Sequence, residues 1–226
     1  MLIFDLGSGA VRGILTSGLD PLAVDRIFFT HFHPDHTVDV VPLLFAMEHG
    51  VEEPRTRPLH IAGPEPFLTF WESLRNVWGQ WMFAEHTDVT ELSQDDAKPL
   101  ELPGCRLSWA PAQHRPESVA YRLDAEDGAF VYTGDTEYCR SVVELARDAD
   151  TLLIECSFPD LARVPGHLTP SDVARIASEA GVKRVVLTHV YPAADKIDLV
   201  SEVGRGFDGA VIVAEDGLSL EVRPAD

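Results

Sequence analysis

Short apolar runs alternate along the chain with polar loops and with longer segments of helical periodicity. Each run has the length and content of a buried or half-buried strand. We expect strands at 2–5, 25–30, 59–64, 106–110, 119–124, 129–133, 151–154 and 184–187. Two further runs, at 210–214 and 218–222, flank Asp216 and Gly217, and this turn sequence predicts a hairpin.

Helix signals occur in the segments 11–18, 37–49, 65–79, 137–148 and 169–179. The last segment has the clearest ends: Thr169 is a preferred cap, Pro170 suits the first helical position and Gly181 suits the stop. In segment 65–79, large apolar side chains recur at intervals of three and four. This spacing predicts a helix with one apolar face packed in the core.

The most informative stretch is 30–36, which reads Thr-His-Phe-His-Pro-Asp-His directly after an apolar run. A strand ending here would deliver His31, His33, Asp35 and His36 to a loop at its carboxyl end, where open α/β sheets build their sites. Histidine nitrogen and carboxylate oxygen are zinc ligands. All four groups would crowd one ion, whereas two ions roughly 3.5–4 Å apart would share them. The alternative is a histidine-rich surface loop that binds nothing.

At these residues the sequence resembles the metallo-β-lactamase superfamily, whose signature is His-x-His-x-Asp-His after a buried strand. Segments similar to the ribonuclease Z branch of that family follow at 112–122, 133–136, 166–169 and 187–189. The resemblance runs over nearly the whole chain. It implies an α/β fold, the four-layer αββα sandwich in which two sheets meet between helical layers.

The resemblance also implies two divalent metal ions and a ligand set for them. The ligands of the first ion would be His31, His33 and His114. The ligands of the second would be Asp35, His36 and His189, and Asp135 would bridge both ions. Nitrogen and carboxylate donors without a thiolate suit Zn²⁺, and Mn²⁺ and Fe also fit such sites. Taken alone, His114 is as compatible with a surface loop as with a ligand role.

Asp35 is also a candidate for catalysis, and two further residues join it. His167 resembles the histidine of the His-Ser-Thr-type motif of ribonuclease Z, here His-Leu-Thr, and would act as general acid for an alkoxide leaving group. Glu155 resembles the glutamate of the His-Glu-Ala-Thr motif, with Ile154 in place of its histidine. Glu155 would orient His167 or a metal-bound histidine. The alternatives are a surface-loop histidine and a carboxylate in a salt bridge.

Aromatic residues at and beyond the end of the predicted helix 65–79 allow two interpretations. Trp78, Trp81 and Phe83 either belong to the core, which we favour, or form a hydrophobic wall or lid over the metals. His86, just after them, is expected on the surface. Asp39 stands where the family commonly has glycine, and it either alters the nearby loop or lines the pocket.

Composition places limits on the remaining possibilities. A chain of 226 residues with 45% hydrophobic content predicts one globular domain spanning 1–226. The formal net charge of -19 works against unaided binding of a polyphosphate backbone. The cysteines, Cys105, Cys139 and Cys156, are scattered, which predicts reduced thiols in a cytoplasmic protein. No apolar run reaches about 18 residues, so we expect no membrane span.

Two departures from the family pattern affect the expected substrate. The family's strand corresponding to 2–5 normally follows an amino-terminal hairpin, for which we expect no counterpart here, either because the start codon is placed too late or because the fold has lost edge strands. The long basic arm with which ribonuclease Z grips RNA also has no counterpart between Asp135 and His189. RNA is therefore a partner that we do not favour.

We expect a metal-dependent hydrolase in which a hydroxide held by two metal ions attacks a small or nucleotide-type phosphodiester. Three alternatives stay open. They are transfer-RNA 3′-processing by a ribonuclease Z, hydrolysis of a lactone, thioester or β-lactam, and metal binding without catalysis. The resemblance also allows a homodimer, because relatives are often homodimers.

A sequence similarity between two segments of the chain agrees with this expectation. Segments 26–34 and 184–192 share a basic residue, three apolar residues, Thr-His, and a proline three positions later. This frame predicts two halves, each of which brings a strand-end histidine to a shared cleft.

Overall fold

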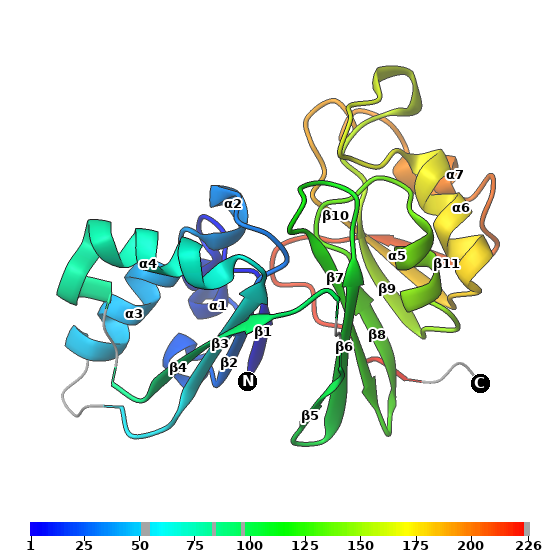
Figure 1. The fold of residues 1–226 in the computed structure, drawn as a ribbon. Coiled ribbons are helices and arrows are strands. Elements are labelled where there is room, and N and C mark those ends of the chain that lie inside the picture. The colour runs from blue at the N-terminus through cyan, green and yellow to red at the C-terminus, as the bar shows by residue number, and fades with distance from the viewer. Residues whose placement is uncertain (51–54, 83–84, 96–97, 224–226) are drawn as a thin grey trace. The chain divides into compact units, whose positions relative to one another are not determined.

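The computed structural model describes residues 1–226 except 51–54, 83–84, 96–97 and 224–226. The chain divides into two compact units, Met1–Ser93 (unit 1) and Gln94–Asp226 (unit 2). Each unit has its own sheet and its own helices (Figure 1). The predicted α/β class with two sheets is confirmed.

The described residues of unit 1 form a four-stranded sheet that is parallel throughout. In spatial order its strands are β1 (Leu2–Phe4), β2 (Arg26–Phe28), β3 (Leu59–Pro64) and β4 (Thr87–Leu92). Its helices are α1 (Ala10–Thr16), α2 (Pro34–Thr37), α3 (Val40–His49) and α4 (Phe67–Trp78), with 3-10 turns at Pro21–Ala23 and Gly79–Met82. Apolar side chains from β2, β3, α3 and α4 form one buried cluster between the sheet and these helices.

The described residues of unit 2 form a seven-stranded sheet in the order β11-β10-β9-β8-β7-β6-β5. The strands are β5 (Leu100–Leu102), β6 (Cys105–Pro111), β7 (Val119–Ala125), β8 (Gly128–Tyr132), β9 (Thr151–Glu155), β10 (Arg184–Thr188) and β11 (Ala210–Val213). The helices are α5 (Arg140–Leu145), α6 (Pro170–Ala180) and α7 (Leu199–Val203), with a 3-10 turn at Asp160–Ala162. Strands β8 to β11 are parallel, and β5 to β8 are antiparallel.

Strand direction determines where the polar loops lie. In unit 1, β1 and β2 run in parallel, so the residues after them meet at one edge of the sheet. In unit 2, β6, β8, β9 and β10 all point the same way, because β6 and β8 are each antiparallel to β7. Within each unit, the candidate residues at the ends of these strands therefore lie at one edge of that unit's sheet, as is typical of α/β sites.

Helix α6 confirms the predicted ends. The Thr169 and Asp172 side chains form a reciprocal capping box, Pro170 takes the first turn, and Gly181 ends the helix with a φ of 69°. The predicted helix 37–49 is instead divided, since α2 ends at Thr37 and α3 begins at Val40.

The break between α2 and α3 has a local cause. The carboxylate of Asp39 accepts a hydrogen bond of 3.0 Å from the backbone of Val11, and the Asp39 N–H donates to the Leu6 carbonyl. Both contacts tie the chain to a neighbouring segment at the point where one continuous helix would have to pass.

The predicted hairpin around Asp216 and Gly217 is wrong. Strand β11 pairs in parallel with β10, and residues 218–222 form no strand. The turn signal is real, because a backbone hydrogen bond joins Leu218 to Glu215. However, the neighbour of β11 is a strand much earlier in the chain, and local turn chemistry does not reveal that pairing.

The core prediction for the aromatic residues is right for part of α4 only. Phe67 and Trp71 are buried, whereas Trp78 and Trp81 are 46% and 49% exposed. The buried core of unit 1 contacts the first half of α4, and Trp78 lies two turns beyond Trp71. Phe83 lies outside the described residues. His86 is exposed, as predicted.

Among the residues that the structure describes, no helix has both the length and the apolar character needed to cross a membrane.

Candidate metal centre

The histidine-rich loop of unit 1 lies between β2 and α2. His33 is the residue before α2, and Pro34 opens that helix. His31 and His36 are buried, with ring centroids 4.2 Å apart, and the centroid of His33 lies 4.7 Å from that of His31. Asp35 is more accessible, since its side chain is 53% exposed. The loop therefore gathers three imidazoles around one point.

Asp5, at the end of β1, organises this loop. Its carboxylate accepts hydrogen bonds from the Thr30 N–H at 2.7 Å and from the Thr30 hydroxyl at 2.8 Å. The same carboxylate lies 2.7 Å from Nδ1 of His36. Gly7 follows in a tight approach, because a Cβ atom there would lie 1.7 Å from the Asp35 carbonyl oxygen. The strand end thus fixes both the backbone and one ring of the loop.

In unit 2, Asp135 is the residue around which the other candidates lie. It is 2% exposed and follows β8. One of its oxygens lies 3.7 Å from Nε2 of His114, and the other lies 3.5 Å from Nε2 of His189. Tetrahedral zinc with bonds of about 2.0–2.1 Å separates its ligand atoms by about 3.3 Å. The spacing around Asp135 is therefore close to that of ligands around an ion.

His167 belongs to the same group. Its Nδ1 lies 4.0 Å from Asp135, and one potential ligand atom each from Asp135, His167 and His189 lies within 4.8 Å of the others. The ring of His167 stacks on that of His189 with centroids 5.7 Å apart. The predicted acid thus lies beside two predicted ligands.

Glu155 is a fully buried carboxylate that receives several hydrogen bonds. One oxygen accepts from the Thr136 N–H at 2.8 Å and lies 3.0 Å from Nδ1 of His167. The other accepts from the Leu168 N–H at 3.1 Å and from the Ser157 hydroxyl at 2.5 Å. The carboxylate therefore fixes the position of the His167 ring.

The remaining histidines of unit 2 are held in a similar way. Nδ1 of His114 lies 2.8 Å from the Gly166 carbonyl, and Nδ1 of His189 lies 2.9 Å from the Ser157 hydroxyl. Gly166 has a φ of 88°, and a Cβ atom there would lie 2.9 Å from Nδ1 of His114. A larger residue at 166 would push the His114 ring away.

These contacts determine which ring nitrogen carries the proton. In the described part of the chain, four histidines have an oxygen beside Nδ1 that settles its role. The oxygen belongs to the Thr30 hydroxyl for His31, the Asp5 carboxylate for His36, the Gly166 carbonyl for His114 and the Ser157 hydroxyl for His189. The carbonyl and the carboxylate only accept, and each hydroxyl already donates to a carboxylate. Nδ1 therefore donates, and Nε2 keeps its lone pair. The histidines concerned are His31, His36, His114 and His189.

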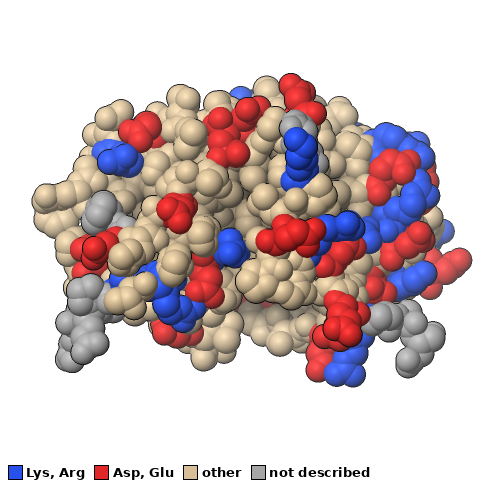
Figure 2. Space-filling view, turned by 60° about the horizontal axis from the view of Figure 1, so that its bottom comes forward, with Lys and Arg blue, Asp and Glu red and all other residues tan. Residues whose placement is uncertain are grey.

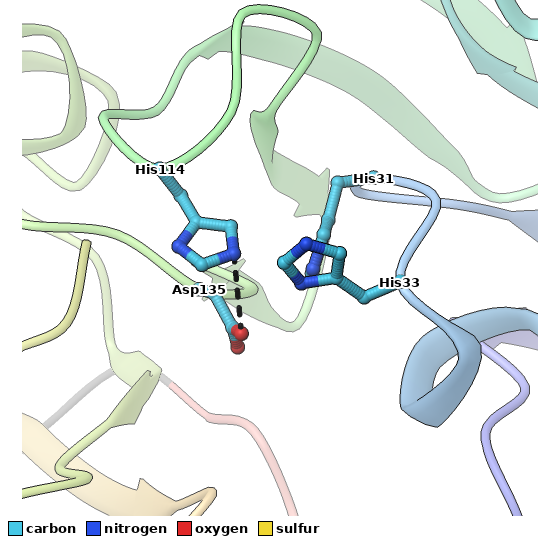
Figure 3. A group of neighbouring side chains, drawn as sticks. All are labelled: His31, His33, His114 and Asp135. Carbon is cyan, nitrogen blue, oxygen red and sulfur yellow. Dashed lines mark ion pairs between the residues drawn. The ribbon is translucent and has the colours of Figure 1, made fainter.

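A neutral histidine whose Nδ1–H is held by an oxygen is the form that binds a metal through Nε2. In each unit the histidine nitrogens lie near a carboxylate, Asp35 in unit 1 and Asp135 in unit 2. Nitrogen and oxygen donors without thiolate are the type that a divalent transition metal takes. Figure 3 draws His31 and His33 on their shared loop, and His114 with its ion pair to Asp135.

The cysteines take no part in these contacts. Cys156 is buried, and burial raises the pKa of its thiol to about 12. Cys105 and Cys139 are half-buried.

Sequence reasoning missed Asp5, Thr30 and Ser157. Asp5 carried a usable signal, because it is a carboxylate directly after an apolar strand in a parallel sheet. Ser157 lies two residues after Glu155, so its side chain returns to the same side of the extended chain. Neither signal predicts which histidine the residue contacts, because the partners are distant in sequence. Asp5 and His36 are 31 residues apart, and Ser157 and His189 are 32 residues apart.

Known proteins resemble this chain along most of its length. The family profile described as the beta-lactamase superfamily domain matches residues 12–190. An uncharacterised protein of Mycobacterium leprae is 30% identical over 98% of this chain and 78% of its own length. Ribonuclease Z of Methanothermobacter thermautotrophicus is 26% identical over the whole of this chain and 89% of its own.

Solved structures agree with the sequence matches. The metallo-beta-lactamase fold protein YhfI of Bacillus subtilis superposes with a TM-score of 0.84 at 26% identity, over 96% of this chain and 85% of that protein. The short form of human tRNase Z superposes with a TM-score of 0.74 at 23% identity, over 97% of this chain and 87% of that protein. The chain belongs to the beta-lactamase superfamily, with the metallo-beta-lactamase fold and with ribonucleases Z among its relatives.

Proposed function

We propose that this member of a hydrolase superfamily is a phosphodiesterase that uses two divalent metal ions and acts on small or nucleotide-type phosphodiesters. The observation that carries the proposal is the position of His167. Its Nδ1 is 3.0 Å from the buried Glu155, and it stands in one group with Asp135 and His189. A histidine fixed beside metal ligands is suited to protonate a leaving group.

The proposed ligands are those that the resemblance implies. His31, His33 and His114 would hold the first ion. Asp35, His36 and His189 would hold the second, and Asp135 could serve both ions because a carboxylate offers two oxygens. We favour Zn²⁺, and Mn²⁺ or Fe suits the same donors. When bound, such ions supply a water molecule of lowered pKa and a positive charge opposite the phosphoryl oxygens.

The chain's own residues carry the other parts of the reaction. Asp5 and Ser157 each engage Nδ1 of a proposed ligand, so that Nε2 of His36 and of His189 is left for a metal. Asp35 is the accessible carboxylate of the proposed set, and it would hold an ion from the solvent-exposed side. His167 delivers a proton to the departing alkoxide oxygen, and Glu155 keeps the ring in the orientation for that transfer.

A ribonuclease Z activity is the second candidate, because curated ribonucleases Z align with the whole chain. A ribonuclease cleaves phosphodiesters, so this kinship supports the proposed bond type. The surface favours small substrates over RNA. On the face drawn in Figure 2, lysine and arginine are interspersed with aspartate and glutamate, and the net charge is -19. Nucleic-acid-binding surfaces usually carry a continuous basic patch.

Several features accompany the proposal. They are the expectations from the sequence of one domain spanning 1–226, a cytoplasmic location, and a homodimer as a state that the resemblance allows. Gel filtration with light scattering tests the homodimer. A mass of one chain at micromolar concentration would contradict it.

The test of the proposed function is a comparison of substrates with protein reconstituted in Zn²⁺ or Mn²⁺. We expect hydrolysis of bis-p-nitrophenyl phosphate and of an unactivated nucleotide diester, and loss of most activity in Asp135→Asn. Transfer-RNA precursors should bind weakly and in a salt-sensitive manner. Turnover of a lactone or thioester without any diester hydrolysis would assign acyl chemistry instead. Accurate 3′ cleavage of a precursor would assign the ribonuclease Z activity.

A further inference from the structure

An apolar groove lies in unit 1 beside the histidine-rich loop. Its volume is about 910 Å³, within the range of small-molecule sites, roughly 300–1,000 Å³. Its lining comes from the loop, α2, α3, α4 and the turn that follows α4. No part of the proposed ligand set lines it, so it is a distinct feature of the same unit.

The groove begins at the ligand loop itself. Phe32 and Pro34 line it, and these residues alternate along the chain with His31, His33 and Asp35. The Thr37 hydroxyl, also in the lining, donates a hydrogen bond of 3.0 Å to the His33 carbonyl. The groove therefore borders the loop that carries His31, His33 and Asp35.

Aromatic rings form much of the groove surface. Phe32 stacks on Phe70 with centroids 4.7 Å apart and planes 7° apart. Phe45, Trp78 and Trp81 are between 44% and 49% exposed. Covering such accessible apolar rings with an apolar group removes them from water and is favourable.

The hydroxyl and the carboxylate in the groove are already engaged. The Thr37 hydroxyl is committed to His33, and the Asp39 carboxylate accepts from the Val11 N–H at 3.0 Å. Among the described lining residues, Asp39 is the only one with a charged side chain, and that charge is negative. The lining thus disfavours a phosphate, and apart from the indole N–H groups of Trp78 and Trp81 its described side chains offer little hydrogen bonding to a sugar or a nucleobase. An uncharged aromatic group is the occupant that the lining favours.

We propose that this groove binds an uncharged aryl substituent on the phosphodiester, and that it sets the substrate preference of the site. The proposal rests on the proposed phosphodiesterase function for its biological meaning. The binding itself depends only on unit 1 and can be measured without turnover. It narrows the substrate class from any small diester to one that carries an apolar ring.

The test uses two non-hydrolysable probes, methyl(4-nitrobenzyl)phosphinate and dimethylphosphinate, titrated calorimetrically into this chain after reconstitution with Zn²⁺. We expect the aryl probe to bind roughly 10- to 100-fold more tightly, the gain typical of burying one ring. Trp81→Ala and Phe45→Ala should each reduce this preference about tenfold. The matched control is Val77→Ala, because Val77 lies on α4, is 74% exposed and does not line the groove.

Fluorescence gives the position of the ring independently. Nitroaryl groups quench tryptophan emission on contact, so the aryl probe should quench the emission of Trp78 and Trp81. Replacing these two residues with Phe should remove the quenching. Trp109→Phe, at a buried position in unit 2, should leave it in place.

Three results would separate the possible outcomes. Equal affinity for both probes, or a preference that Trp81→Ala and Phe45→Ala do not change, would overturn the aryl subsite. A dimer that these variants dissociate, with the preference intact, would assign the groove to a second copy of the chain. Aryl preference without hydrolysis of any diester would support the subsite and overturn the proposed catalytic function.

Discussion

At the scale of single residues, the site is organised by the hydrogen bonds that the histidines make through Nδ1. Asp5, Ser157 and the Gly166 carbonyl each engage one Nδ1, from positions that the ligand motifs do not include. Such partners fix the ring orientation and the tautomer. The ligand types follow from the motif spacing, whereas their orientation depends on contacts between distant parts of each unit.

Asp5→Asn should weaken metal binding. The amide keeps one acceptor oxygen, but it cannot satisfy the two donors of Thr30 and the ring of His36 as a carboxylate does. Loss of such a partner typically lowers metal affinity 10- to 100-fold. Competition with a chromogenic chelator measures the affinity. Asp20→Asn is the control, since Asp20 caps an exposed turn of the same unit. Equal affinities in the wild type and Asp5→Asn would contradict the assigned role.

His167→Ala should discriminate between leaving groups. An unactivated diester expels an alkoxide and needs a proton, so its kcat should fall by roughly 10²–10⁴-fold. A p-nitrophenolate leaves without protonation, so much of the activity on bis-p-nitrophenyl phosphate should remain. Metal content should stay unchanged, and His86→Ala, at an exposed position, is the control. Equal losses on both substrates would show that His167 serves binding or structure.

At the scale of elements, local chemistry predicted α6 best. Thr169, Pro170 and Gly181 act within one or two turns of their own positions, so the sequence contains all of the information. The hairpin prediction at 210–222 failed because the partner of β11 is β10, which a turn motif cannot indicate. Strand β4 lacks the apolar run that predicted the other strands, because its side chains alternate between partly buried and exposed positions.

The capping box of α6 makes a testable contribution to stability. The Thr169 N–H and hydroxyl both donate to Asp172, at 3.1 and 2.8 Å, and Thr169 is fully buried. Thr169→Ala should therefore lower the free energy of unfolding by about 1–2 kcal/mol, the upper part of the range for caps. Urea denaturation measures the change. Thr16→Ala, at the exposed end of α1, should have a much smaller effect. Equal shifts in the two variants would show that the capping box contributes nothing special.

The exposed ends of α3 and α4 show a second limit of prediction. Helical periodicity correctly identified an apolar face, but periodicity does not say which part of that face the core covers. Phe67 and Trp71 meet the core, whereas Trp78 and Trp81 line the groove. The alternative prediction was that these aromatic residues form a hydrophobic wall. In the structure, Trp78 and Trp81 line a groove within unit 1. Ligand-binding measurements can show what occupies it.

At the scale of the whole molecule, two units repeat one plan. In each, a parallel strand leads into Thr-His, through β2 to His31 in unit 1 and through β10 to His189 in unit 2. The sequence similarity between segments 26–34 and 184–192 predicted this plan. The ligand motifs are local and could therefore be recognised in the sequence. That the proposed ligands together hold two metal ions is the central claim about the molecule.

Metal stoichiometry tests that claim most directly. Protein purified without chelator, then reconstituted with excess Zn²⁺ or Mn²⁺ and freed of unbound metal, should contain about two ions per chain by elemental analysis. Asp135→Asn should contain fewer, because it loses the proposed bridge, whereas Asp20→Asn should match the wild type. One ion or none in the reconstituted wild type would contradict the two-metal centre, and with it the proposed mechanism.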